Sequence, residues 1–455
     1  MKNFNPIIKL FSLLILIIVS VFFSCKKMIA INAPINESVA GKVFSSDASA
    51  ISALSGLYIT FLNTFDGAFM LLPSLSSDEL NTSDVSYLAF NSNSLNANEG
   101  YNSTQWNKFY NLIYQSNSII EGVQSSNSLS SGIKNQLLGE AKFMRAFIHF
   151  ELLNFYGDVP LITTTDVKVT SIAFRKSTNL VYQQIITDLK DAQGLLKDIY
   201  VSSDRARVNK STAKALLARV YLYQKDYANA EIQSTDMINN SDLYQLESID
   251  QTFLKSSKET IFQIANINGY TGIAGSLITG TGATKANYFY TPNFQNAIET
   301  GDQRKNSWIK SIAVNGVTYL YPYKYKKLSS TVGLQPEYLV VFRLAEQYLI
   351  RAEARTQLGS NLKGAREDLN VIRRRAGLLD YQQETKGELL DAIEKERRIE
   401  LNTEFGHRWL DLKRTQRVDA VMSAIKPNWK PSAALYPIPA SELRNDPNLT
   451  QNPNY

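Results

Sequence analysis

The chain has 455 residues and a nearly balanced charge, with 48 Lys and Arg against 42 Asp and Glu, which gives a formal net charge of +6 at pH 7. On so long a chain this mild positive charge argues against a nucleic-acid-binding protein. The sequence contains one cysteine. An internal disulfide is therefore excluded, and the fold must be held by a hydrophobic core.

The first residues have the pattern of an export signal. Two lysines precede an apolar run that ends at residue 23 and is too short for a comfortable membrane span. Ser24 and Cys25 follow, and a small residue before a cysteine is typical of a lipoprotein signal, in which the cysteine is acylated. An ordinary signal peptide or single anchor with an incidental cysteine is the alternative, and Phe22 stands where leucine is more usual. We predict a signal at 1–24, lipidation of Cys25, a tether at 25–47 and one binding domain at 48–455.

Helical periodicity runs through most of the predicted domain. Between Asn81 and Ser103, eleven of twenty-three residues are Asn or Ser, which is the composition of a loop. A Gly-Asp-Val-Pro sequence after Tyr156 is expected to stop one long helix. The expected helical segments begin at Ala48 and continue at 105–123, 133–156, 179–196, 211–224, 227–238, 348–375 and 389–414. The proline-rich tail after residue 427 is expected to be extended and to pack across the helices.

Two of these segments look like repeated helical pairs. In 211–238 and again in 348–375, small alanines stand where two helices would cross, with Tyr or Leu between them. This arrangement suits closely packed antiparallel helices, as in tetratricopeptide repeats. The sequence therefore predicts a mainly α fold, built on a tetratricopeptide-like scaffold of helical pairs with long loop insertions and minor β structure.

The region from about 268 to 336 interrupts this scaffold. Glycines punctuate its start, and Tyr319, Tyr321, Tyr323 and Tyr325 alternate at the period of a strand. Long excursions of this kind tend to carry function. A sugar binder needs exposed aromatic plates beside polar side chains, although most of these aromatic residues could equally belong to the core. The ligand-binding candidates in the two loop regions are Asn81, Tyr87, Phe90, Tyr288, Tyr290 and Trp308.

The residues give little sign of catalysis. His149 and His407 are far apart, each inside a helical pattern, and no group of ligands has the spacing of a zinc site. A dense cluster of Glu, Asp and Arg between residues 396 and 414 could supply two carboxylates for glycoside hydrolysis. Neighbouring arginines would lower the pKa of an acid catalyst, however, so we expect ion pairs instead. Arg408 is expected to hold Glu404 and Asp411. We predict no catalytic residue, no metal and no cofactor.

Several segments contain motifs such as Gly-Glu-Ala-Lys-Phe-Met-Arg-Ala, Tyr-Gly-Asp-Val-Pro-Leu and His-Arg-Trp-x-Asp-Leu-Lys-Arg. Together these segments resemble the SusD/RagB family of outer-membrane nutrient-binding lipoproteins. No single motif is decisive, but seven occur in the family's order. Two departures are Phe405, which separates Glu404 from Gly406, and two lysines after Cys25 in place of an acidic tag. The segments lie at 139–161, 207–221, 343–354, 368–377, 396–401, 407–414 and 435–455.

The resemblance implies a function as well as a fold. It implies capture of an oligosaccharide, or alternatively a peptide, and delivery to a SusC-like, TonB-dependent outer-membrane barrel. It also implies attachment to outer-membrane lipid through Cys25, with display on the cell surface inferred from the family alone. A helical-repeat scaffold that binds only protein is a further alternative, and a glycosidase is the enzymatic one. The family motifs belong to the scaffold, so the resemblance transfers no ligand contacts.

Overall fold

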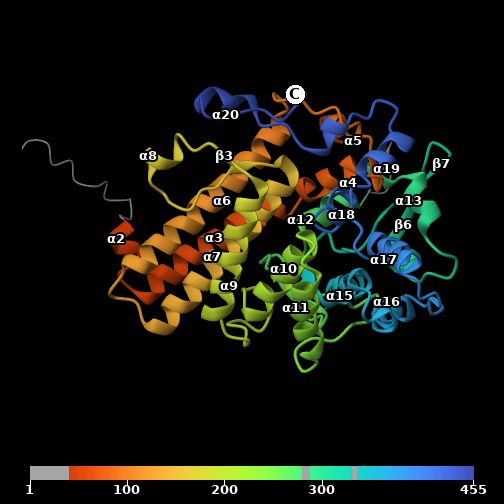
Figure 1. Ribbon diagram of the computed structural model, residues 1–455, viewed down its shortest axis with the longest axis horizontal. Coiled ribbons are helices and arrows are strands. Elements are labelled where there is room, and N and C mark those ends of the chain that lie inside the picture. Colours follow the sequence, from red (N-terminus) through yellow and green to blue (C-terminus); the bar gives the residue numbers. More distant parts are fainter. Residues whose placement is uncertain (1–39, 279–286, 330–335) are drawn as a thin grey trace, which may run out of the picture.

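The computed structural model describes residues 40–278, 287–329 and 336–455. Its framework is a stack of helices in which each packs beside the next, from the long helices at one side of Figure 1 to the shorter pairs at the other. The principal helices are α3 (Asp47–Phe65), α6 (Gly100–Ser125), α7 (Ser131–Tyr156), α9 (Thr178–Leu195), α10 (Lys210–Tyr223), α11 (Tyr227–Asn239), α15 (Leu344–Leu358), α16 (Leu362–Arg375) and α17 (Lys386–Glu400).

The paired helices begin and end at residues that commonly cap helices. Asn209 begins α10 with a reciprocal capping box to Thr212, and Asn361 caps α16 through its side chain. Gly359 ends α15 in the left-handed conformation, which glycine adopts without steric cost. The packing of α10 on α11, of α11 on α15 and of α15 on α16 forms the predicted tetratricopeptide-like scaffold, which is confirmed.

The N-terminal part differs in one respect from the prediction. A short helix, α2 (Ala40–Val43), lies inside the segment expected to be a tether. Phe44 follows it and is buried against α6, because Gly122 has no side chain where the ring lies.

The next helix, α3, is long and apolar enough to cross a membrane by length and composition. It instead packs along α6 and α7, with Leu54, Leu57 and Phe61 in the core. Residues 1–39, including Cys25, lie outside the described residues.

The single helix expected over 389–414 is wrong, because two helices occupy this segment. After α17 the chain turns through residues 401–406, and α18 (His407–Arg414) follows. Thr403, Phe405 and Gly406 all have positive φ angles, which a continuous helix does not allow. The turn separates the two halves of the charged cluster and gives them different neighbours.

The loop regions contain short elements that the sequence reading did not resolve. Between α3 and α6 lie η1 (Ala68–Leu71), α4 (Leu72–Ser76), β1 (Leu80–Thr82), η2 (Val85–Tyr87) and α5 (Leu88–Asn91). The excursion contains α12 (Gly272–Leu277), β5 (Tyr288–Tyr290), α13 (Pro292–Ala297), α14 (Arg304–Ser307), β6 (Ile309–Val314) and β7 (Val317–Pro322). The strand expected from the alternating tyrosines is confirmed for Tyr319 and Tyr321, which lie in β7, and β7 pairs with β6 as an antiparallel hairpin. Tyr323 and Tyr325 follow the end of this strand.

Three further antiparallel strand pairs are present in the described part of the chain. Strand β1 pairs with β5, β2 (Val159–Pro160) with β3 (Arg175–Lys176), and β4 (Thr260–Ile264) with β8 (Leu339–Arg343). The short helix α8 (Val167–Thr170) lies between β2 and β3. Pairing of β1 with β5 joins the Asn- and Ser-rich loop to the excursion, although more than two hundred residues separate them in sequence.

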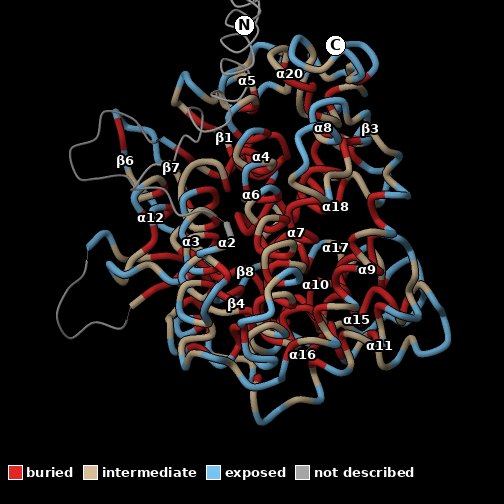
Figure 2. Tube along the Cα trace, turned by 90° about the vertical axis from the view of Figure 1, so that its left-hand side faces the viewer, coloured by how far each residue is buried: buried red, intermediate tan, exposed pale blue. Residues whose placement is uncertain are grey.

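The tail packs across the helices, as expected. The helix α19 (Val418–Ile425) precedes it. The tail is not wholly extended, because it contains η3 (Pro431–Ala434) and α20 (Ala440–Asn445), and α20 lies at the upper edge of the molecule in Figure 1. Tyr436 is fully buried and stacks on Phe155 at a centroid distance of 5.4 Å. The Asn452 amide donates to the carbonyls of Tyr156 and Tyr436. The tail therefore covers one end of the core, whose buried residues form the interior in Figure 2.

Candidate functional site: an amide-rich pocket

A pocket of about 560 Å³ lies where the Asn- and Ser-rich loop, the excursion and the tail meet. Five of its lining residues are asparagines, and the only charged one is Lys426. We call it the amide pocket. Its walls are formed by Ser77, Asn81, Asn91, Ser92, Thr291, Pro292, Asn293, Asn296, Ile425, Lys426, Pro427 and Asn428.

The two asparagines of the first wall are held by hydrogen bonds. Asn81 lies in β1, and the Asn91 amide at the end of α5 donates to the Leu80 carbonyl at 3.1 Å and to the Asn81 Oδ1 at 3.3 Å. This contact fixes the orientation of both side chains. It occupies one lone pair of the Asn81 carbonyl oxygen. Among the described residues, none accepts a hydrogen bond from the Asn81 amide nitrogen, which leaves it as a donor for a ligand hydroxyl.

The second wall is the first turn of α13. Thr291 caps this helix by accepting from the Phe294 N–H at 3.1 Å, and its hydroxyl donates to the Asp78 carbonyl at 2.6 Å. Pro292 stands at the first helical position, where its fixed φ angle suits the helix. Asn293 and Asn296 follow as exposed side chains, and Asn293 accepts a hydrogen bond from Arg398. The capping signal therefore places two amides at the pocket.

Lys426 follows α19 and anchors the third wall. Its ammonium group donates to the carbonyls of Leu75 and Ser76, each at 3.1 Å, and to the Asn93 Oδ1 at 2.6 Å. Burial lowers the pKa of Lys426 to about 7, against the smaller opposing effect of Asp78. These bonds tie the tail to α4 at the base of the amide pocket.

A half-buried aromatic residue of β5 lies across the strand pair from Asn81 of the pocket wall. In the antiparallel pair of β1 and β5, Asn81 lies directly opposite Phe289, so the two side chains share one face of the pair. Phe289 is half-buried and makes an edge-to-face contact with Tyr319 of β7 at 4.8 Å. Phe289, which was not among the six candidates, is thus the aromatic residue of β5 that lies beside Asn81, although it does not line the pocket itself.

The predicted candidates Tyr288 and Tyr290 lie on the opposite face of β5 and are buried, 4% and 1% exposed. The Tyr290 hydroxyl donates to the Asn402 Oδ1 at 2.6 Å, and its ring stacks on Phe294. Their expected role as exposed plates is corrected by this burial. Strand alternation is the physical reason, because two residues that flank Phe289 must both point away from its face.

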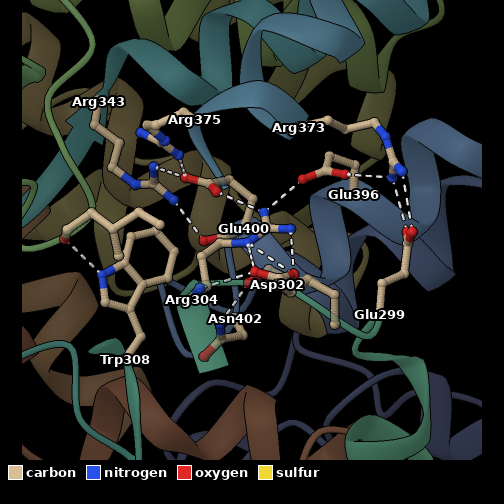
Figure 3. A network of polar contacts seen from close by, with 12 residues as sticks. Glu299, Asp302, Arg304, Trp308, Arg343, Arg373, Arg375, Glu396, Glu400 and Asn402 are labelled. Carbon is tan, nitrogen blue, oxygen red and sulfur yellow. Dashed lines mark hydrogen bonds and ion pairs between the residues drawn. The ribbon is translucent and has the colours of Figure 1, made fainter. Parts of the chain in front are cut away.

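Trp308 also requires correction, because only 1% of its surface is exposed. Figure 3 shows its indole beside a network of buried arginines and carboxylates. The indole N–H donates to the Ile249 carbonyl at 2.9 Å, and the Lys324 ammonium lies 4.7 Å from the ring centroid. A ring so enclosed has no free face for a ligand. Trp308 instead packs over the charged network, where it excludes water.

The last three candidates differ from one another. Phe90 is fully buried against Tyr436, with ring centroids 5.5 Å apart, so its expected role at a ligand is corrected as well. Tyr87 is half-buried and packs on Tyr101 and Tyr288, but it does not line the amide pocket. Of the six candidates, only Asn81 lines the pocket.

The expectation of ion pairs in the charged cluster is confirmed, but the expected partners are wrong. Arg304 donates to Glu396 at 2.6 Å and to Glu400 at 2.9 Å, and Arg343 and Arg375 also pair with Glu400 (Figure 3). Burial alone would raise the pKa of Glu400, but these three guanidinium groups hold it well below its usual range. A carboxylate so stabilised in its charged form is a poor proton donor.

Arg408 also pairs with residues other than those expected. Its guanidinium donates to both carboxylate oxygens of Asp78, at 2.7 and 2.9 Å, and to Glu394 at 2.9 Å. Glu404 is paired with Arg343 and Lys324, and Asp411 with Arg397 and Arg414. The expected pairing of Arg408 with Glu404 and Asp411 is therefore wrong. The turn at 401–406 is the physical reason, because it directs the side chains of α17 and α18 to different neighbours.

The two histidines are buried in the core. The His149 Nδ1 lies 3.0 Å from the Arg145 carbonyl, and burial followed by the charge of Arg145 lowers the pKa of this imidazole to about 3. Burial and the nearby Arg219 likewise lower the pKa of His407. Both rings are therefore neutral at pH 7. Within the described ranges, no group of three His, Cys, Asp or Glu side chains could hold a metal ion.

Comparison with known proteins gives two family matches. Residues 68–222 match a SusD-like family described as starch-binding and associating with the outer membrane, and residues 278–455 match the SusD family. SusD-like protein P38 of Formosa agariphila is 27% identical over 416 residues, which cover 77% of this chain and 79% of that protein. A SusD-like protein of Bacteroides ovatus is 25% identical over 363 residues, or 68% of this chain and 64% of that protein.

Solved structures agree with these matches. A SusD superfamily protein of Bacteroides vulgatus superposes with a TM-score of 0.79 at 19% identity, covering 90% of this chain and all of the other. A laminarin-binding SusD-like protein superposes with a TM-score of 0.76 at 25% identity, covering 90% and 99%. From the family matches, the relatives and the shared helical fold, we conclude that this chain belongs to the SusD/RagB family.

Proposed function

We propose that this chain is a glycan-capture lipoprotein, which binds an oligosaccharide reversibly in the amide pocket. The observation that carries the proposal is the pocket itself, because five asparagines converge from three distant segments and Phe289 lies beside them. Amide groups both donate and accept, so they match sugar hydroxyls, and an aromatic edge suits the apolar face of a sugar ring. The laminarin-binding neighbour supports this ligand class.

The proposed role ends with handover rather than chemistry. The carboxylates of the charged cluster are paired with guanidinium groups, and the pocket contains no carboxylate among its lining residues. Reversible binding through neutral amides leaves the glycosidic bonds intact. As the second part of the proposal, a TonB-dependent, SusC-like barrel receives the bound glycan.

The location is part of the same proposal. The export signal and Ser24-Cys25 support a lipid anchor in the outer membrane, and one matched family is described as associating with that membrane. The tether holds the domain at the membrane surface, where captured glycan is close to the barrel. Display on the outer face of the cell completes the proposed arrangement.

Titration calorimetry on the detergent-solubilised full-length protein tests the glycan proposal. Laminarin, starch and a panel of other polysaccharides serve as probes, and we expect at least one to bind. Replacing Asn81 and Asn293 together by Ala should weaken that glycan about tenfold, since each lost hydrogen bond contributes roughly 0.5–1.5 kcal/mol.

The matched control is Asn179→Ala, an exposed asparagine at the start of α9, which should leave affinity unchanged. Wild-type protein that binds none of the glycans, or an Asn81→Ala/Asn293→Ala variant with wild-type affinity, would contradict the proposed site. Binding of peptides in place of glycans would support the peptide alternative.

A further inference from the structure

A second pocket, of about 360 Å³, shares no lining residue with the amide pocket. It lies between α6, the loop that contains α8, and α20, which are near one another in Figure 1. Trp106, Tyr110 and Tyr114 stand four residues apart on α6, so they share one helix face, and all three line the pocket. Trp106 and Tyr110 are in contact at 4.8 Å, and Tyr114 is 54% exposed.

The charged lining of this aromatic pocket is purely acidic. Glu442 and Asp446 are its only charged residues, and they lie four residues apart at α20. Within the described part of the chain, the Glu442 carboxylate accepts from the Ser441 hydroxyl at 3.2 Å and the Asp446 carboxylate from the Asn448 N–H at 2.9 Å. Neither carboxylate forms an ion pair with a described residue. Two negative charges therefore face the pocket without a cation.

Arg175 is a basic residue near Tyr110, and its guanidinium group already donates hydrogen bonds to other residues. Its guanidinium donates to the carbonyls of Asp158 at 2.7 Å and Thr450 at 3.0 Å, and also to Asn452. Burial first and the charge of Glu442 second raise the pKa of the Tyr110 hydroxyl, against the opposing charge of Arg175. That effect requires the carboxylate to be close to a ring of the pocket wall. The aromatic rings and the acidic groups thus belong to one site.

The rim of the pocket is unusually apolar. Val167, Val169, Ile172 and Phe174 are between 53% and 70% exposed and lie in the same loop as the lining residues 170, 171 and 173. Single exposed apolar residues are ordinary, but four within eight residues beside a concave site indicate a contact surface. Three of these side chains are aliphatic, and the fourth, Phe174, already has the Lys176 ammonium group 3.7 Å from its ring centroid. Exposed aliphatic side chains beside a pocket suit a polypeptide partner.

We propose that this pocket binds a Lys or Arg side chain of a partner polypeptide, whose flanking apolar residues pack on the α8 loop. The cation lies against the rings of Tyr110 and Tyr114, since the face of an aromatic ring attracts positive charge. Glu442 and Asp446 neutralise it. The surface is separate from the amide pocket, so the proposal is independent of glycan binding.

The test uses detergent-solubilised full-length protein and two peptides of identical shape. Acetyl-Leu-Arg-Leu-amide carries the cation, and acetyl-Leu-citrulline-Leu-amide replaces guanidinium by neutral urea. We expect the arginine peptide to bind about fivefold more tightly, the size of a partly exposed charge pair. Added salt should reduce the difference, because it screens the two carboxylates.

Variants test whether the two carboxylates of the pocket, and not the overall charge of the protein, cause the preference for the arginine peptide. The double change Glu442→Gln and Asp446→Asn should abolish the preference for the arginine peptide, and Tyr114→Ala should weaken it. Asp242→Asn removes one exposed charge just after α11 and should have no effect. Glycan affinity should be unchanged in every variant, which keeps this test distinct from that of the amide pocket.

Three results would overturn the proposal. They are equal affinity for the two peptides, binding of neither peptide, and an unaltered preference after removal of both carboxylates. A glucosamine oligosaccharide that binds this pocket more tightly than the arginine peptide would also overturn it, because the ligand would then be a cationic sugar.

Discussion

Arg408 joins two parts of the chain that are 330 residues apart. Both oxygens of the Asp78 carboxylate accept from it, and Asp78 is only 1% exposed. We expect Arg408→Ala to lower the free energy of unfolding by about 3 kcal/mol, because it leaves a buried carboxylate with less compensation. Urea unfolding followed by circular dichroism measures this loss.

The control for Arg408 is an arginine whose ion pairs are exposed. Arg374 binds Glu367 and Asp380, each at 2.9 Å, with the side chains 40–50% exposed. Replacing it by Ala should cost only about 0.5 kcal/mol, because water and salt screen such pairs. Equal losses for the two variants would show that burial does not decide the contribution of Arg408.

A buried carboxyl group gives a prediction about pH. Burial raises the pKa of Glu151 to about 8, and one of its oxygens has no hydrogen-bond partner among the described residues. The folded protein therefore binds one more proton than the unfolded chain, whose glutamate has a pKa of about 4.3. The free energy of unfolding should thus fall as pH rises from about 4 to about 8.

Glu151→Gln removes this titration while preserving the shape of the side chain. We expect the variant to melt at a higher temperature than the wild-type protein at pH 9, with the difference largely absent at pH 5. Calorimetric scans at pH 5, 7 and 9 compare the two proteins. A difference that is the same at all three pH values would contradict the raised pKa.

The charged residues show which features of the ion pairs can be predicted from sequence alone. That the carboxylates of residues 396–411 would pair with arginines was predictable, because unpaired buried charges are too costly. The partners were not predictable, since Asp78 and Arg304 reach the cluster only through the tertiary fold. Spacing along one helix offers nearby partners but carries no information about residues hundreds of positions away.

Among the elements, the short strand β5 gives a matched pair of variants. Phe289 and Tyr290 are neighbours with opposite directions, one beside the amide pocket and one in the core. We expect Phe289→Ala to weaken glycan binding severalfold with little change in melting temperature. Tyr290→Ala should instead lower the melting temperature, since it opens a cavity and strands Asn402. The reverse pattern would mean that the register of β1 and β5 is wrong.

The turn between α17 and α18 depends on a glycine. Gly406 has a φ angle of +69°, and an added Cβ would lie 2.7 Å from the Cβ of Pro73. Gly406→Ala should therefore lower the free energy of unfolding by about 2 kcal/mol. Gly387→Ala in the first turn of α17 meets no atom within 4 Å and should stabilise the protein by about 0.5 kcal/mol. Denaturant unfolding of both variants shows whether the loss of stability comes from backbone strain at Gly406 or from a general effect of replacing glycine by alanine.

Helical periodicity predicted the long elements well because burial repeats along one face of each helix. The same reasoning failed at 401–406, where positive φ angles end a helix without a proline. It also failed for the aromatic residues of the excursion, because composition does not tell which face of a short strand is buried. The alternation of side chains along a strand predicts that Phe289 lies on the opposite face from Tyr288 and Tyr290. It does not predict which of the two faces is exposed.

For the molecule as a whole, the anchor is a separate prediction. Cys25→Ala should prevent acylation and release the protein from the membrane fraction, because no lipid would then hold the domain there. Fractionation after labelling with a radioactive fatty acid measures both effects, and Ser49→Ala, at a half-buried position in the first turn of α3, is a control that should stay labelled. A Cys25→Ala protein that remains labelled and membrane-bound would contradict lipidation.

Family and fold were accessible from sequence because the scaffold motifs are local and follow a fixed order. The amide pocket was not, since its asparagines come from residues 81–91, 293–296 and 428 and meet only when the tail packs across the helices. None of these residues has a distinctive local pattern, and only Asn81 was selected. The proposed binding site therefore depends on long-range packing.

The buried position of Tyr436 has a consequence for biosynthesis. The ribosome makes the helices from α3 to α18 before this residue, so Phe90, Phe155 and Tyr156 lack their aromatic partner until it emerges. A nascent or truncated chain that stops at Trp429 presents these rings to chaperones and proteases. Chains with a late premature stop should therefore be degraded, although every helix of the scaffold has been synthesised.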